Sequence, residues 1–167
     1  MRKLVGLLLL LAALVALVAC SSGVRELTPE LEELLVLINE TRSQGYDCAS
    51  RYMPPTEPLA ADARLNWAAQ LHAEDMDAAG QLSHETPPGA IHFAPGTSPG
   101  ERLTQAGYLY VAMGENIARG QVSPEEVLAA WLASTEGHCE GLMDGRYVHA
   151  GLGKSGAYWV LDMAAPQ

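Results

Sequence analysis

Apolar residues recur at helical spacing in three parts of the chain, and this pattern predicts three helices. The first begins at Thr28-Pro29, a capping threonine followed by a proline that suits the first turn, and it ends at Gly45. The second runs from about Asp62 to Ala79 and stops at Gly80. The third begins at Ser123-Pro124, where a glutamate three residues after the serine completes a capping box.

The C-terminal part changes to short apolar runs that are typical of strands. Residues 148–153 and 157–163 predict a hairpin joined across Lys154-Ser155-Gly156, and a further short strand is expected around Glu115 to Ala118. Residues 46–60, with three prolines, and residues 81–106, with several prolines and glycines, predict loops, the second with a turn or short helix near its end. With helices first, a hairpin last and no repeat, we expect one small α+β domain built in layers.

The N-terminus has the pattern of an export signal. Arg2 and Lys3 precede an unbroken apolar run of 16 residues, Leu4 to Ala19, which is short for a membrane span and right for a secretory signal. The run ends in Leu17-Val18-Ala19-Cys20, which resembles the lipobox of bacterial lipoproteins. The resemblance implies a signal peptide over residues 1–19, acyl chains on Cys20, a tether over 20–27 and a folded domain over 28–167. A transmembrane anchor or a plain secreted form is the alternative.

Charge narrows the range of partners. The chain has 20 acidic and 10 basic side chains and a formal charge of −10. Such a chain has no basic surface with which to neutralise a run of phosphates, so we expect no nucleic-acid partner. The predicted membrane contact is therefore the lipid anchor at Cys20 rather than a polybasic patch.

Two cysteines remain once Cys20 is set aside. Cys48 and Cys139 form an even pair, and an exported protein reaches a compartment that permits disulfides. A bond between them closes a loop of roughly 90 residues, worth on the order of 4–5 kcal/mol in the chain-entropy model. The alternative is two free thiols, or a thiolate nucleophile at Cys139 beside His138.

Three short segments follow one another in a recognisable order. They are Leu82-Ser83-His84, Gly114-Glu115-Asn116-Ile117-Ala118, and Trp131-Leu132-Ala133-Ser134 leading to Gly137-His138-Cys139. Together they resemble the CAP superfamily, which holds cysteine-rich secretory proteins, antigen 5 and pathogenesis-related proteins, and the bacterial branch in particular. The likeness extends from about Leu34 to Met163.

The resemblance implies a three-layer α-β-α sandwich with two histidines facing each other across a cleft. Carried over by motif, His84 and His138 are the cleft histidines and Glu115 is their carboxylate. Two imidazoles and one carboxylate form an open zinc site with room for water, so Zn²⁺ is the expected cofactor. The alternative is structural: Glu115 accepts hydrogen bonds and orders the surrounding loop.

One segment departs from the family pattern. Three residues after the tryptophan, relatives have either a second glutamate or a serine that is followed by Pro-Gly-His. Here the chain reads Ser134-Thr135-Glu136-Gly137-His138, which is one residue longer and lacks the proline. The position of His138 is therefore the least certain part of the site. Glu136 either restores the missing carboxylate or is a solvated loop residue, and we favour the second.

The sequence supports three functional hypotheses. The first is an envelope-anchored, extracytoplasmic binding module, lipid-anchored to a bacterial membrane (the outer one where there are two), whose cleft holds a metal, a lipid, a sterol or another envelope ligand without turnover. The second is a metal-dependent peptidase of the cell envelope with Glu115 as general base. The third is a structural envelope protein. We favour the first, because neither a third firm metal ligand nor an activated nucleophile is evident.

Overall fold

The computed structural model describes residues 26–49 and 51–167. The predicted signal peptide, Cys20 and most of the tether lie outside these residues. Within the described part, no helix is both long and apolar enough to cross a membrane. The elements in chain order are α1 (Pro29–Gln44), β1 (Tyr46–Cys48), β2 (Arg51–Met53), β3 (Ala60–Ala61), α2 (Ala63–Ala79), α3 (Pro99–Gln105), β4 (Tyr110–Arg119), α4 (Pro124–Leu132), α5 (His138–Leu142), β5 (His149–Ser155) and β6 (Tyr158–Pro166).

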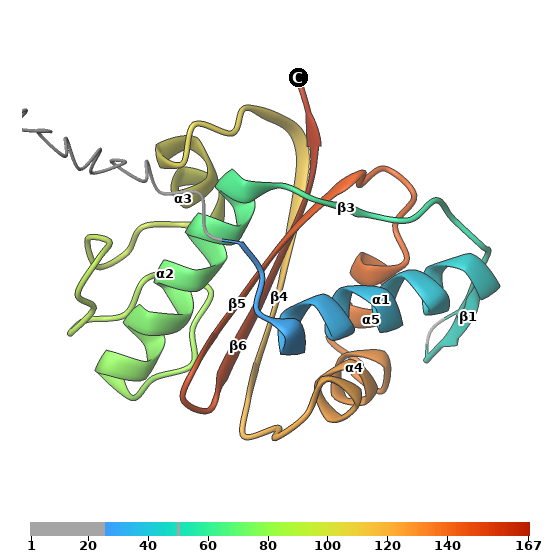
Figure 1. Ribbon diagram of the computed structural model, residues 1–167, viewed down its shortest axis with the longest axis horizontal. Helices are drawn as coiled ribbons and strands as arrows, with labels where there is room; N and C mark the ends of the chain where they lie inside the picture. Colours follow the sequence, from blue (N-terminus) through green and yellow to red (C-terminus); the bar gives the residue numbers. More distant parts are fainter. Residues whose placement is uncertain (1–25, 50) are drawn as a thin grey trace, which may run out of the picture.

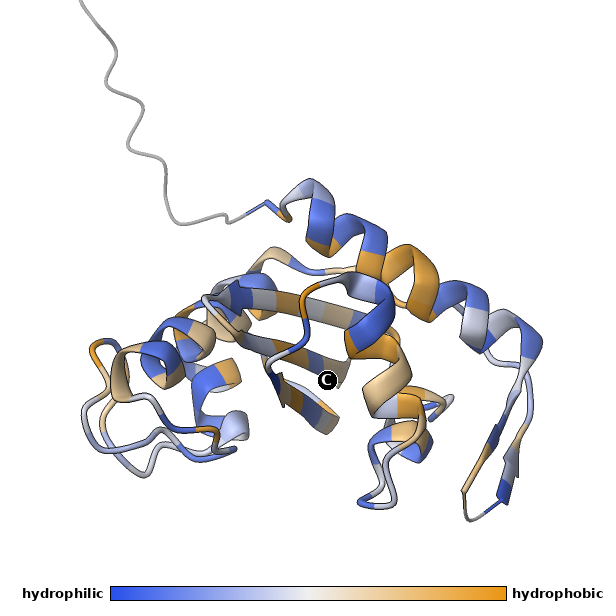
Figure 2. Ribbon diagram, turned by 90° about the horizontal axis from the view of Figure 1, so that it is seen from below, coloured by the Kyte–Doolittle hydropathy of each residue, from blue (hydrophilic) through white to orange (hydrophobic). Residues whose placement is uncertain are grey.

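A four-stranded sheet separates two layers of helices (Figures 1 and 2), which confirms the predicted α-β-α sandwich. The strand order is β3-β5-β6-β4, with β3 parallel to β5 and the other neighbours antiparallel. α2 and α3 lie on one face, and α1, α4 and α5 lie on the other. β1 and β2 form a separate hairpin beyond the end of α1.

The three predicted helices are present with the expected capping residues. The side chain of Thr28 accepts from the backbone of Leu31, and that of Asp62 accepts from Arg64. Ser123 caps α4 through the N–H of Glu126. These local signals act within one turn of helix, so the sequence alone reveals them.

The structure differs from the sequence prediction in the strands and in one helix. β4 is ten residues long rather than four, because its first half pairs with the end of β6, a contact between segments far apart in the chain. The region 46–60, expected to be a loop, contains β1, β2 and β3. The five-residue helix α5 was not predicted, since it is too short to show a helical pattern.

α2 packs directly against β5 because that strand carries two glycines on the same face. A Cβ at Gly151 would collide with the backbone of Leu65, and one at Gly153 would collide with the backbone of Ala69. Residues two apart in a strand face the same side. The pair therefore lets the helix backbone approach the sheet at van der Waals distance.

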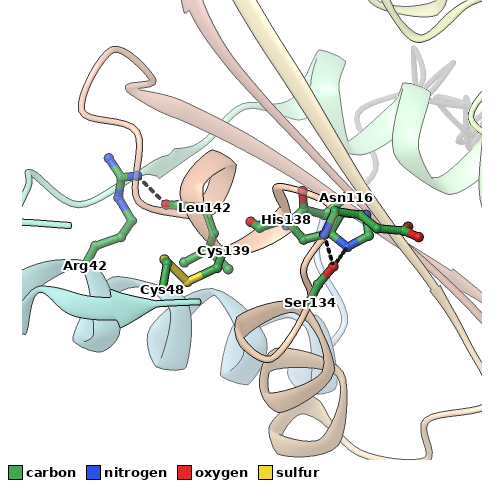
Figure 3. The surroundings of a disulfide bond; sticks show 8 residues. Arg42, Cys48, Asn116, Ser134, His138, Cys139 and Leu142 are labelled. Atoms are coloured by element: carbon green, nitrogen blue, oxygen red, sulfur yellow. Dashed lines mark hydrogen bonds between the residues drawn. A yellow bond between two sulfur atoms is a disulfide. The ribbon is translucent and has the colours of Figure 1, made fainter. Parts of the chain in front are cut away.

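Cys48 and Cys139 form a disulfide, as predicted (Figure 3). It joins the β1–β2 hairpin to α5 across 91 residues. Both cysteines are buried and neither is a free thiol, so the thiolate nucleophile considered for Cys139 is wrong. Beside the disulfide, the buried Arg42 of α1 donates to the carbonyl oxygens of Leu142 and Tyr147, which holds the chain around α5 in place.

Candidate functional site: a two-histidine cleft

Glu115 lies in the middle of β4 with its side chain only 2% exposed. One carboxylate oxygen is 2.8 Å from Nδ1 of His84, and the other accepts from the guanidinium of Arg102 at 2.6 Å. Burial by itself raises the pKa of Glu115, but the hydrogen bond from His84 and the charge of Arg102 outweigh it, so its pKa is lowered. Glu115 is therefore an ionised carboxylate with one hydrogen bond to each of its two oxygens.

His84 follows α2 in the long loop and is held from two sides. Arg102 of α3 donates to the backbone oxygen of His84 at 2.9 Å, while Glu115 holds its ring. The hydrogen bond with Glu115 raises the pKa of His84, and this effect exceeds the lowering by burial. Because Glu115 only accepts, the proton between them sits on Nδ1, and Nε2 of His84 carries the lone pair when the ring is neutral.

His138 is the first residue of α5, on the opposite layer from His84. Its Nδ1 lies 2.8 Å from the hydroxyl of Ser134, and its backbone oxygen accepts from the amide of Asn116 at 3.0 Å (Figure 3). Burial lowers the pKa of His138, and the neighbouring His84 lowers it further. The lengthened loop thus still brings this histidine opposite His84, and Ser134 holds its ring through Nδ1.

The two imidazole rings face each other across the cleft. Their centroids are 6.5 Å apart with an angle of 41° between the planes. Each ring is fixed through Nδ1, and among the described residues neither Nε2 has a hydrogen-bond partner. The chain therefore brings His84, Glu115 and His138 to one place, with two ring nitrogens available for a ligand.

The hydrogen bonds of His84, Glu115 and His138 decide which of their atoms are available to a metal ion. Within the described residues, no group of three His, Cys, Asp or Glu side chains has the arrangement of a metal site. Both oxygens of Glu115 are engaged, so the donors that fit are Nε2 of His84 and Nε2 of His138, with Glu115 orienting His84 from behind. A carboxylate in that position fixes the ring and raises its basicity.

Two buried polar residues behind Glu115 were missed in the sequence analysis. Asp162 of β6 is opposite Glu115 in the strand register and is fully buried. Burial and the charge of Glu115 raise its pKa well above the ordinary value. A single acid within the apolar run of β6 is the sequence signal that would have found it.

Arg102 was missed as well, and no sequence signal distinguishes it from other charged helix residues. It is fully buried, and it bonds to Glu115 and to the backbone of the His84 loop. It therefore ties α3, β4 and the loop together at the site.

Glu136 and the other histidines are not part of the ring pair. Glu136 is exposed beside His138, as a solvated loop residue would be. His72 of α2 is buried and bonds to the backbone oxygen of Ser83 at 2.9 Å. His92 is exposed and pairs with Glu74 at 2.7 Å, and His149 contacts the hydroxyl of Tyr108.

A groove of about 440 Å³ adjoins His138 and runs along the end of β4 toward Gln121. A larger cavity of about 640 Å³ lies elsewhere, between the β1–β2 hairpin and the chain after α5. None of the three predicted site residues lines the larger cavity. Of the three predicted site residues, His138 lines the groove, whereas His84 and Glu115 do not.

Comparisons with known proteins identify the family of the chain. The profile of the cysteine-rich secretory protein (CAP) family matches residues 35–162. The protein YkwD of Bacillus subtilis (strain 168) is 34% identical over 113 residues, 66% of this chain and 41% of that protein, so the chain spans less than half of this relative.

Two solved structures share the fold. One is an extracellular protein containing an SCP domain from Bacillus anthracis, with a TM-score of 0.65 and 23% identity over 84% of this chain and 44% of that one. The other is an outer surface protein from Borrelia burgdorferi, with a TM-score of 0.67 and 19% identity over 86% of this chain and 97% of that one.

Proposed function

The chain belongs to the cysteine-rich secretory protein family, and from this premise we propose that it is an extracytoplasmic, lipid-anchored binding protein whose histidine cleft holds a divalent cation without turnover. The cation would bind to Nε2 of His84 and Nε2 of His138. Water or a second ligand would complete its coordination, as in zinc sites that keep open positions.

The observation that carries the proposal is the orientation of the two rings. Glu115 and Ser134 each hold a Nδ1 atom, so that two imidazoles face each other with their centroids 6.5 Å apart. Neutral imidazole nitrogen is a common protein ligand for Zn²⁺ and similar ions. Rings fixed in this way lose little side-chain freedom when a cation binds.

The state of Glu115 supports binding rather than hydrolysis. A general base needs a free lone pair near the water that it deprotonates. Glu115 gives one oxygen to His84 and the other to Arg102, and its pKa is lowered, which makes it a poor proton acceptor. We therefore propose that Glu115 orients His84. A lipid or sterol in the cleft stays a prediction.

The location of the protein is part of the proposal. The apolar run that ends at Cys20 supports export and acylation, and the disulfide between Cys48 and Cys139 suits a compartment outside the cytoplasm. Both structural relatives carry names that place them outside the cell or on its surface.

Calorimetric titration of the full-length chain in detergent with ZnCl₂ tests the cation site. At pH 7.5 we expect binding of one ion, and at pH 5.5 we expect it to weaken at least tenfold. The sign follows from the raised pKa of His84: below that pKa a proton occupies the ring, and the ion has to displace it.

Histidine variants provide the control. His84→Ala and His138→Ala should each abolish the heat of binding, whereas His92→Ala should leave it unchanged, because His92 lies outside the cleft beside Glu74. No heat at pH 7.5, or equal loss in His92→Ala, would refute the proposal.

A further inference from the structure

Two adjacent residues of β4 hold the two histidines from opposite faces of the sheet. Glu115 contacts Nδ1 of His84 at 2.8 Å, on the face where it also bonds to Arg102 of α3. The side-chain amide of Asn116 donates to the backbone oxygen of His138 at 3.0 Å, on the face that α5 covers. Successive side chains of a strand point to opposite faces, so a single dipeptide reaches both halves of the cleft.

The next residues of β4 follow the same alternation. Ile117 packs in a cluster with Ala69 and Ala73 of α2, whereas Ala118 packs in the cluster that contains residues of α1 and α4. The strand therefore lies between the two helical layers, and it is the element that has direct contact with both histidine segments.

The position of α5 depends on contacts with other elements. The helix has only five residues, and Gly137 before it provides no side-chain cap. A helix of this length is not stable by itself. Because His138 is the first residue of α5, the contacts that hold this helix also decide where the second imidazole ring lies.

Two of these contacts come from the layer that contains α5. The disulfide joins Cys139 to Cys48 of the hairpin, and Arg42 of α1 donates to the last carbonyl of α5 at 2.6 Å (Figure 3). They fix α5 relative to α1 and the hairpin, neither of which carries a residue of the ring pair. Asn116 instead joins α5 to the strand that carries Glu115.

Ser134 and Asn116 act on different parts of His138. The hydroxyl of Ser134 contacts Nδ1 and so orients the ring, whereas the amide of Asn116 holds the backbone from which the ring extends (Figure 3). Asn116 is only 2% exposed, and a Cβ on Gly141 of α5 would lie 3.7 Å from its Oδ1 atom. The helix therefore packs closely on this amide, where water does not readily replace a lost hydrogen bond.

We propose that Asn116 is a positioning residue of the cleft. Through the carbonyl of His138 it sets the separation between the two rings, whose centroids are 6.5 Å apart, and thereby the affinity for a cation. The effect on the cation rests on the proposed function. The effect on the ring separation does not, because it can be measured without a cation.

Asn39 provides a matched control. Its side-chain amide donates to the backbone oxygen of Leu59 at 3.0 Å, the same kind of bond at the same distance, and it also accepts from the N–H of Leu59. Asn39→Ala therefore removes at least as much hydrogen bonding as Asn116→Ala, but at a place that has no contact with the ring pair.

Nuclear Overhauser spectroscopy measures the ring separation directly. The sample is the full-length chain in detergent, with ¹³C-labelled histidine and with EDTA present. We expect a cross-peak between the ring protons of His84 and His138 in the wild type and in Asn39→Ala. The cross-peak should be lost in Asn116→Ala, because α5 is then no longer joined to the strand that holds Glu115.

Calorimetric titration with ZnCl₂ at pH 7.5 measures the effect on the cation. Asn116→Ala should bind Zn²⁺ at least tenfold more weakly than the wild type, whereas Asn39→Ala should bind it equally well. Asn116→Leu fills the space of the amide without a donor and should behave like Asn116→Ala. It keeps the test decisive if the alanine variant does not fold.

Three results would overturn the role of Asn116: a wild-type cross-peak in the Asn116 variants, no cross-peak in the wild type, or equal losses in Asn39→Ala. Unfolding of both Asn116 variants beside a folded Asn39→Ala would also overturn it, because Asn116 would then support the whole domain. A wild type that shows the cross-peak but binds no Zn²⁺ would refute the proposed function alone, since the cross-peak decides the positioning.

Discussion

At the scale of single residues, the site depends on a buried set of charges that balance one another. Arg102 is a buried cation, Glu115 is a buried anion with a lowered pKa, and Asp162 has its pKa raised well above the ordinary value by burial and by the charge of Glu115. The charges of Arg102 and Glu115 are in direct contact. Burying them costs free energy that their mutual hydrogen bonding offsets only while both partners are present.

Glu115→Gln tests this balance. The variant leaves the Arg102 charge buried without its counterion, so we expect the free energy of unfolding to fall by about 3 kcal/mol. The pKa of His84, which the Glu115 hydrogen bond raises, should drop in the same variant. Urea denaturation and an NMR titration of the histidine ring protons measure the two effects.

Glu40→Gln is the matched control, because Glu40 is exposed on α1. It should change neither the free energy of unfolding nor the pKa of His84. A Glu115→Gln protein as stable as the wild type would mean that Arg102 finds another partner in the folded state.

A second prediction at this scale concerns His72. Its burial lowers its pKa from 6.5 to about 4, so the folded protein holds this ring neutral. A histidine whose folded pKa is depressed adds stability above pH 6.5, and that stability is lost as the pH falls through the window down to about 4. The loss amounts to about 3 kcal/mol at 1.4 kcal/mol per pKa unit.

Urea denaturation of wild type and His72→Gln between pH 4 and 7.5 checks this sign. The free energy of unfolding of the variant should depend less steeply on pH, by about one proton, within the window. Parallel curves for the two proteins would show that His72 has the same pKa in the folded and unfolded states.

At the scale of elements, those with local sequence signals could be predicted, whereas those that depend on contacts between distant segments could not. α1, α2 and α4 have capping residues and apolar stripes within their own sequences, and their starts were predicted from those signals. The first half of β4 depends on pairing with β6, and α5 depends on the disulfide and on Asn116, which holds the carbonyl of His138. Neither dependence is visible in a local pattern.

The candidate site follows the same division. His84, Glu115 and His138 were found through the order of short motifs, which the sequence displays directly. Arg102 and Asp162 act through burial and through the register of β4 with β6. Those properties arise only in the folded chain, so the electrostatic support of the site could not be predicted.

The contact between α2 and β5 provides a prediction at the element scale. Gly153→Ala places a Cβ against the backbone of Ala69, which neither element can avoid without moving the helix. We expect the free energy of unfolding to fall by at least about 2 kcal/mol, the cost of overpacking a rigid contact. Thermal denaturation followed by circular dichroism measures the change.

Gly141→Ala is the control variant, because a Cβ at Gly141 has room. A Cβ there would meet Asn116 at 3.7 Å, an ordinary contact, so its effect should be small by comparison. Equal losses in the two variants would show that the helix–sheet contact at Gly153 does not set the cost, because reduced flexibility of the unfolded chain acts in the stabilising direction.

At the scale of the whole molecule, the proposed anchor determines where the site works. α1 begins at Pro29, nine residues after Cys20. A chain of that length reaches at most about 30 Å, so acylation of Cys20 would keep the domain within that distance of the membrane surface. A cation bound by the cleft would then be held close to the membrane.

Cys20→Ala tests the anchor in an expressing bacterium. Acylation needs the Cys20 thiol, so labelled palmitate should be absent from the variant and present in Cys48→Ser, which removes a disulfide cysteine instead. A single acyl chain binds membranes only marginally, whereas several anchor a protein stably; the wild type should therefore sediment with membranes after a high-salt wash. If Cys20→Ala still carried the label, the acylated residue would lie elsewhere, and the 30 Å limit on the position of the domain would no longer hold.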